Sequence, residues 1–159
     1  MPFDCTPVVE NPTPLVGGGG DSGIALSFNP TAPKPARVMP IPARHLNRGP
    51  ESISSTIAVL VRARALIGHD QYWCRGAFAR SWFSVPVRPH SFFARRFCVV
   101  GALKLAAREL LLPTQNAYLA LEWQAGRRVE GWNDDPRRTH AEVVALFDAA
   151  MVALRQASL

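Results

Sequence analysis

The segment Arg95-Arg96-Phe97-Cys98-Val99-Val100-Gly101-Ala102-Leu103 belongs to the longest apolar helical run in the chain. Val99, Ala102, Leu103, Ala106 and Leu110 recur at helical spacing, which predicts a helix from about Phe92 that stops before Pro113. A glycine inside a helix costs about 1 kcal/mol relative to alanine. We therefore expect another backbone or a ring to approach this helix closely at Gly101.

Three more helices are predicted around this run. The first spans about residues 51–67, with Pro50 before it and Gly68 after it, and its apolar positions are Ile53, Ile57, Leu60 and Val61. The second begins at Thr114 and ends at Gly126, with Tyr118, Leu121 and Trp123 facing inward. The third follows the capping-box pattern Thr139-His140-Ala141-Glu142 and carries Val143, Phe147, Ala150, Met151 and Leu154 on one stripe.

The segments between these helices are less regular. A similar cluster of aromatic, cysteine, glycine and alanine residues beside an arginine occurs at Tyr72–Ala77, and residues 72–80 predict a short helix or a turn. Residues 82–89 predict an extended or irregular segment, because Pro86 and Pro89 exclude a helix interior; a short edge hairpin is the alternative. Residues 131–136, Gly-Trp-Asn-Asp-Asp-Pro, predict a turn.

These elements predict a mostly α fold, an irregular bundle of four to five helices with an aromatic-rich irregular loop region. The domain spans residues 50–159. Residues 1–49 hold most of the 14 prolines and the run Gly17–Gly20, and this composition indicates a flexible arm, either disordered or strap-like. Apolar side chains in the arm favour docking along a groove as the alternative to a free tail: Ile24, Leu26, Phe28, Met39 and Ile41.

Four short motifs follow one another along the chain: Trp73-Cys74-x-Gly76-Ala77, Cys98-x-x-Gly101-Ala102-Leu103, Trp132-Asn133-Asp134 and Ala141-Glu142-Val143. The series resembles a group of small, uncharacterised bacterial and phage-borne proteins built on a W-[CT]-x-G-A … C-x-x-G-A-L … W-N-D … A-E-V pattern. The resemblance covers roughly residues 55–155. It implies a compact helical domain, and no activity is established for the group.

Composition limits the classes of function. The net charge of +6 favours an acidic partner, either a protein or a nucleic acid. No apolar run reaches the roughly 18 residues of a membrane span, and no secretory signal is evident, so we expect no membrane partner. Three cysteines are too few for a disulfide scaffold and favour the cytoplasm. No cofactor motif and no metal-ligand spacing is evident, so neither a cofactor nor a metal is expected.

The segment between Gln71 and Ala107 concentrates positive charge, since it holds no Asp or Glu. Its cations are Arg75, Arg80, Arg88, Arg95, Arg96 and Lys104, interleaved with Tyr72, Trp73, Phe78, Trp82, Phe83, Phe92, Phe93 and Phe97. Cations beside aromatic rings suit single-stranded nucleic acid or a phosphorylated ligand. Alternatively, the rings fill the core while the arginines extend outward, with Arg80 and Arg88 facing solvent. Trp132 and Asn133 are further candidate binding residues, because they could line a small pocket.

We therefore expect a non-enzymatic binding or adaptor module, with the basic, aromatic-rich segment as its contact surface. The alternative is a cysteine-dependent enzyme in which Cys98, near a helix start, is the nucleophile, His140 the base and Asp134 its orienting partner. The other interpretation of Asp134 is structural, with its carboxylate accepting from Arg95 or Arg96 and fixing the loop to the central helix.

Overall fold

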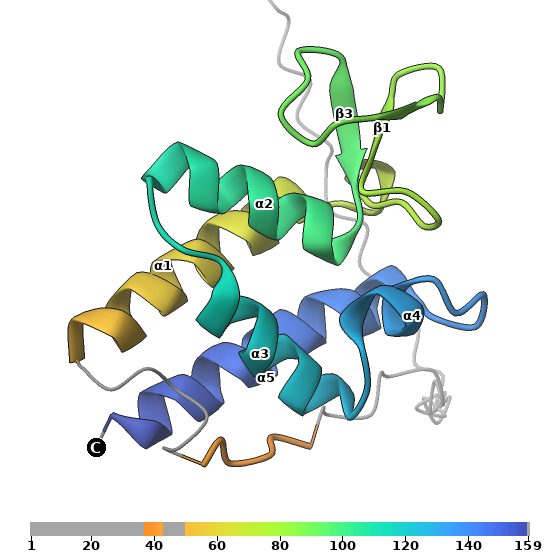
Figure 1. Ribbon diagram of the computed structural model, residues 1–159. Helices are drawn as coiled ribbons and strands as arrows, with labels where there is room; N and C mark the ends of the chain where they lie inside the picture. The colour runs from red at the N-terminus through yellow and green to blue at the C-terminus, as the bar shows by residue number, and fades with distance from the viewer. Residues whose placement is uncertain (1–36, 43–49, 159) are drawn as a thin grey trace, which may run out of the picture. The chain divides into compact units, whose positions relative to one another are not determined.

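The computed structural model describes residues 37–42 and 50–158 of the chain, and the fold is mostly α-helical, as predicted (Figure 1). In order, the elements are α1 (Pro50–Leu66), the 3-10 helix η2 (Asp70–Tyr72), β1 (Ala79–Ser81), β2 (Pro86–Val87), β3 (Ala94–Phe97), α2 (Val99–Leu110), α3 (Gln115–Ala125), α4 (Val129–Asn133) and α5 (His140–Ala157). The strands form one antiparallel sheet in the order β2-β1-β3.

The core lies among the four longer helices. α1 packs against both α2 and α5, and α3 packs against α5. Each helix contributes side chains that are almost completely buried, including Leu60, Leu103, Leu121 and Phe147. Because the sheet leads directly into α2 through β3, it stands at the N-terminal end of that helix (Figure 1).

The predicted stripes are largely confirmed. All five residues predicted for the last helix are buried, and the capping box of Thr139 and Glu142 is formed. Val61 and Leu110, however, are 48% and 40% exposed, so the predicted stripes of α1 and α2 are wrong at these two positions. Thr114 precedes α3 as expected, but its side chain makes no capping hydrogen bond.

The helix predicted from Phe92 begins only at Val99, because residues 94–97 form strand β3. Cys98 is the residue before the first turn, and its Sγ accepts a hydrogen bond from the Gly101 amide at 3.3 Å. The Cys98 amide donates to the Phe78 carbonyl at 3.1 Å. Pairing with β1 and these two contacts together set the start of α2, and none of them is visible in hydrophobic periodicity.

Gly101 confirms the predicted close approach. A Cβ at this position would stand 1.7 Å from the Phe78 carbonyl oxygen and 2.6 Å from its carbon. Since both are backbone atoms, and the same oxygen is held by the Cys98 amide, neither can move aside cheaply. Only glycine lets α2 start against the segment that precedes β1.

Two irregular segments differ from expectation in detail. The segment after Tyr72 is neither a helix nor a single turn: the 3-10 helix η2 ends at Tyr72, and the chain then continues toward β1. The edge-hairpin alternative is confirmed, since β1 and β2 pair across residues 82–85. The turn predicted at residues 131–136 is wrong in its first half, where α4 continues through Asn133.

Residues 37–42 lie along α3. The Met39 amide donates to Gln124 Oε1 at 2.8 Å, and Gln124 Nε2 donates to the Met39 carbonyl at 2.6 Å. Trp123 Nε1 donates to the Pro40 carbonyl, and Ile41 is buried in the core. Docking is therefore confirmed for Met39 and Ile41, while Ile24, Leu26, Phe28 and the Gly17–Gly20 run lie outside the described residues.

Candidate functional site

Four large aromatic side chains of the sheet's loops are exposed. Trp82 and Phe83, in the β1–β2 turn, are 77% and 86% exposed, and Phe92 and Phe93, just before β3, are 83% and 67% exposed. Ser81 pairs with Ala94, so the end of β1 lies beside the start of β3 and both loops leave the sheet at the same end. We call these four residues the aromatic tip.

The aromatic tip corrects the expectation that the rings of this segment fill the core. Of the eight aromatic residues, only Phe97 is buried. Phe78 and Tyr72 are about half exposed, at 43% and 40%, and Lys104 Nζ lies 4.0 Å from the centroid of the Phe78 ring. Phe92 and Phe93 meet edge to face at 5.8 Å.

The six cations of the segment have no carboxylate within 4 Å among the described residues. The six ion pairs of that part of the chain belong to other arginines: Arg62, Arg64, Arg127, Arg128, Arg137 and Arg138. Arg95 donates to the carbonyls of Phe92 and Ala94, which carry no net charge. Within residues 37–42 and 50–158, no acidic side chain therefore compensates the positive charge of the segment.

Exposure divides these cations into two groups. Arg88, Arg95 and Lys104 are exposed, whereas Arg75, Arg80 and Arg96 are half-buried. The prediction that Arg80 faces solvent is wrong, because its guanidinium donates to the carbonyls of Arg75 and Ser84. Arg88 is exposed as predicted.

Trp132-Asn133-Asp134 forms a clamp between α4, the segment after η2 and the start of α2. Asn133 is fully buried, and its Oδ1 accepts from Trp73 Nε1 at 2.8 Å and from the Val99 amide at 3.3 Å. Its Nδ2 donates to the Cys74 carbonyl at 3.2 Å. Every polar atom of this amide is thus used within the fold, and Asn133 holds structure rather than lining a pocket.

Asp134 and Trp132 support the same clamp. Asp134 Oδ1 accepts from the Gly76 amide at 2.9 Å and from Asn133 Nδ2 at 2.8 Å. The structural interpretation of Asp134 stands, but its predicted partners, Arg95 or Arg96, are wrong. Trp132 is 8% exposed, and the Arg138 guanidinium lies 4.1 Å from its ring centroid. A backbone amide carries no sequence signal, so sequence analysis could not find this partner.

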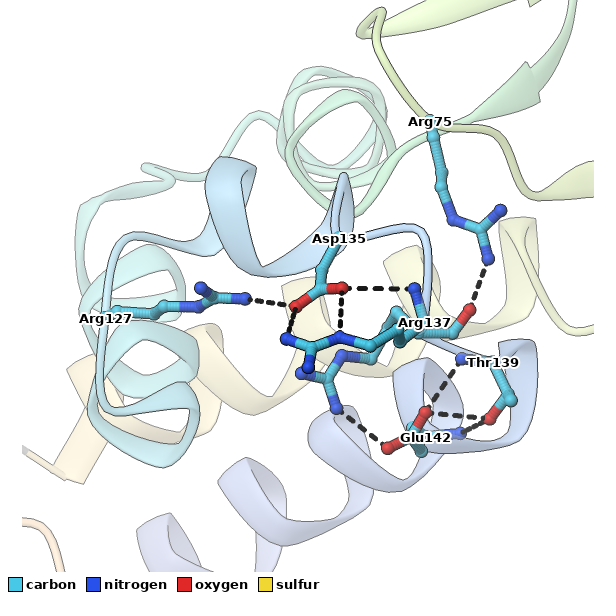
Figure 2. A network of polar contacts seen from close by, with 7 residues as sticks. Arg75, Arg127, Asp135, Arg137, Thr139 and Glu142 are labelled. Atoms are coloured by element: carbon cyan, nitrogen blue, oxygen red, sulfur yellow. Dashed lines mark hydrogen bonds and ion pairs between the residues drawn. The ribbon is translucent and has the colours of Figure 1, made fainter.

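Arg75 connects the same region to the start of α5. Its Nη2 donates to the carbonyl of Arg138, as Figure 2 shows, and its guanidinium lies 4.3 Å from the Trp73 ring centroid. Arg138 in turn pairs with Glu142 at 2.8 Å, and Asp135 pairs with Arg127 and Arg137. The hydrogen bond that Arg137 donates holds the pKa of Asp135 well below its usual range. The loop before α5 is therefore firmly fixed.

Cys98, His140 and Asp134 each bond to other groups. Cys98 Sγ accepts from Gly101, and burial raises the pKa of this thiol above its usual value. His140 Nε2 lies 2.7 Å from the Ile67 carbonyl oxygen, and its ring lies beside Trp73. A nucleophile needs an accessible thiolate and a base within hydrogen-bond reach. The hydrogen bonds of the described residues give the three side chains structural partners instead.

Within the described ranges, no group of three or more His, Cys, Asp or Glu residues is placed to hold a metal ion. No helix in residues 37–42 and 50–158 combines the length and apolarity needed to cross a membrane.

Comparison with known proteins gives a family and no activity. Neither a curated protein nor a solved structure matches the chain. Residues 52–153 match the model of DUF6197, a family of unknown function. This range contains the sheet, the clamp, the whole of α2, α3 and α4, and most of α1 and α5. The chain therefore belongs to the family of unknown function DUF6197.

Proposed function

We propose that the chain is a non-enzymatic binding module that engages an acidic macromolecule through its basic, aromatic-rich segment. The observation that carries the proposal is the aromatic tip, exposed beside cations that no carboxylate of the described residues neutralises. A contiguous exposed apolar surface marks an interaction site on a protein in solution. Uncompensated cations beside it require a partner of negative charge.

Single-stranded nucleic acid is the partner that this chemistry favours. Its bases stack on exposed aromatic rings, with each stacked base contributing about 1–3 kcal/mol, while its phosphates bind arginine and lysine. Trp82, Phe83, Phe92 and Phe93 offer the rings, and Arg88 and Arg95 are exposed cations on the same loops and strand. The proposal includes a cytoplasmic location, favoured by the low cysteine count, and a bacterial or phage origin, implied by the family resemblance.

The experiment measures fluorescence anisotropy of labelled 20-nucleotide DNA and RNA single strands over a series of NaCl concentrations. Trp82→Ala with Phe92→Ala should weaken binding at every salt concentration, because stacking is lost. Arg88→Ala with Arg95→Ala should weaken binding and flatten the dependence of log Kd on log salt, by roughly 0.7 per lost phosphate contact. Thermal stability should change little, since these side chains are exposed.

Arg155→Ala is the matched control, because Arg155 is exposed on α5 and its side chain makes no ion pair in the described part of the chain. An equal loss of binding in this control would show that only net charge matters and would contradict the assigned surface. No binding to any strand at low salt would rule out nucleic acid. The proposal would then apply to an acidic protein partner, sought by pull-down with the aromatic-tip variant as the negative control.

A further inference from the structure

A polar cavity of about 560 Å³ lies between η2, β1 and β3. Its lining includes Gln71, Trp73, Arg75, Arg80, Ser84 and Arg96. Asp70 is the one carboxylate of the lining, so three arginines and one aspartate give the cavity a net charge of +2. We call this cavity the arginine pocket.

Two of the three arginines are placed against each other by the sheet. Arg80 on β1 is the direct cross-strand partner of Arg96 on β3. Side chains of such a pair point to the same face of a sheet, and like charges directly opposite each other destabilise the pairing. Both side chains are half-buried, where water screens their repulsion less than at the surface. An unneutralised pair of this kind indicates a place for an anion.

The remaining contacts leave donors available in the pocket. Arg80 uses three of its five N–H groups on the carbonyls of Arg75 and Ser84, which fixes its position and leaves two. The guanidinium of Arg96 makes no hydrogen bond and no ion pair with the described residues. Arg75 is anchored through Arg138 and Trp73, and its buried Nε has no partner in the structure.

We propose that the arginine pocket binds the phosphate group of a phosphate ester, with Arg80 and Arg96 as its two direct ligands and Arg75 as the third charge. Guanidinium groups bind phosphate through paired N–H···O bonds, and a phosphate offers enough oxygens to serve several arginines at once. The inference rests on the proposed function in one respect, since a phosphate of the bound polymer would enter the pocket while its bases reach the aromatic tip.

The test uses the full chain and inorganic phosphate, followed by thermal unfolding and isothermal titration calorimetry at constant ionic strength. Phosphate should bind and raise the unfolding midpoint by a few degrees, whereas acetate and chloride at equal ionic strength should not. A nucleoside monophosphate and a dinucleotide, titrated in the same way, distinguish a terminal phosphate from a backbone phosphodiester as the source.

Arg96→Gln gives the sharper result because it predicts two opposite changes. The variant should unfold at a higher temperature than the wild type without phosphate, since the cross-strand repulsion is removed. It should also bind phosphate at least about tenfold more weakly, the effect of losing one charge-assisted hydrogen bond. Arg155→Gln, at an exposed position of α5 outside the lining of the pocket, should leave phosphate binding unchanged.

Undiminished phosphate binding by Arg96→Gln, or equal stabilisation by acetate, would overturn the pocket assignment. So would the absence of phosphate binding at millimolar concentrations, even if oligonucleotides still bind through the aromatic tip. Phosphate binding that depends on Arg96, without any oligonucleotide binding, would support the pocket and reject nucleic acid as the partner.

Discussion

At the scale of single residues, Gly101 has the largest predicted effect on stability. Gly101→Ala would place a methyl group on the Phe78 backbone, so we expect a loss of about 3 kcal/mol or more in the free energy of unfolding. Gly131→Ala is the matched control, since Gly131 also lies in a helix and nothing stands within 4 Å of the added Cβ. It should gain up to about 1 kcal/mol. Urea unfolding followed by circular dichroism measures both, and similar midpoints for the two variants would contradict the close approach.

The two described cysteines should be unreactive in the native protein. Both are buried, and burial raises the pKa of Cys98 above its usual value and that of Cys74 to about 12. In a Cys5→Ser background, iodoacetamide at pH 7.5 should modify neither thiol until the protein is denatured, as measured by mass spectrometry. Rapid native alkylation of Cys98 would favour the cysteine-enzyme hypothesis over the binding module.

At the scale of elements, the stability that the N-terminal cap of α5 contributes depends on pH. The Thr139 amide donates to Glu142 and holds the pKa of this carboxylate below its usual range, with further lowering from the Thr139 hydroxyl and Arg138 (Figure 2). Because the pKa of Glu142 is lower in the folded than in the unfolded protein, its ionised carboxylate adds to the free energy of unfolding. This contribution is fully present above the unfolded-state pKa of about 4.3 and is lost as pH falls through the folded-state pKa.

Glu142→Gln should therefore cost about 0.5 kcal/mol at pH 7, a modest value because Glu142 is 41% exposed, and less at pH 3. Thr139→Ala is the comparison, since the hydroxyl that caps the Glu142 amide does not titrate. Most of its cost of about 1 kcal/mol should persist at both pH values, because the Glu142 amide donates to the Thr139 hydroxyl whether or not the carboxylate is ionised. Urea midpoints at pH 7 and pH 3 provide the measurement, and a Glu142→Gln effect independent of pH would be the contrary result.

Helices and strands differ in how far the sequence could predict them. The buried stripes of α2 and α5 repeat at local spacing, and the capping box of Thr139 and Glu142 is a local motif, so both were predictable. Strand β3 was not, because it forms by pairing with residues 79–81 and its buried Phe97 continues the apolar pattern of α2. Hydrophobic periodicity therefore merged the strand into the helix.

The candidate site shows the same limit. Sequence composition identified the segment from its missing carboxylates, and it named Arg80 and Arg96 among the cations. It could not place them opposite each other, since that requires the register of two strands. Nor could it separate Trp82, on an exposed turn, from the buried Trp132, because burial depends on tertiary neighbours.

At the scale of the whole molecule, the remaining question is which part of residues 1–49 the helical core requires. Residues 39–41 contribute a buried Ile41 and hydrogen bonds to Trp123 and Gln124. A chain beginning at residue 37 keeps these contacts, and we expect unfolding at the same urea concentration as the full chain. A chain beginning at residue 50 loses them and should be less stable by about 2–3 kcal/mol, mainly the value of one buried isoleucine.

Gln124→Ala in the full chain separates the two kinds of contact, because it removes the paired hydrogen bonds to Met39 and leaves Ile41 able to pack. It should cost about 1–2 kcal/mol, less than the deletion to residue 50. Circular dichroism at 222 nm should show equal helical signal per molecule for the full chain and the two shortened chains, since all five α-helices lie at or after Pro50. If the chain from residue 37 is as unstable as the chain from residue 50, residues before 37 contribute to the core, and the Pro/Gly-rich arm is part of the folded domain.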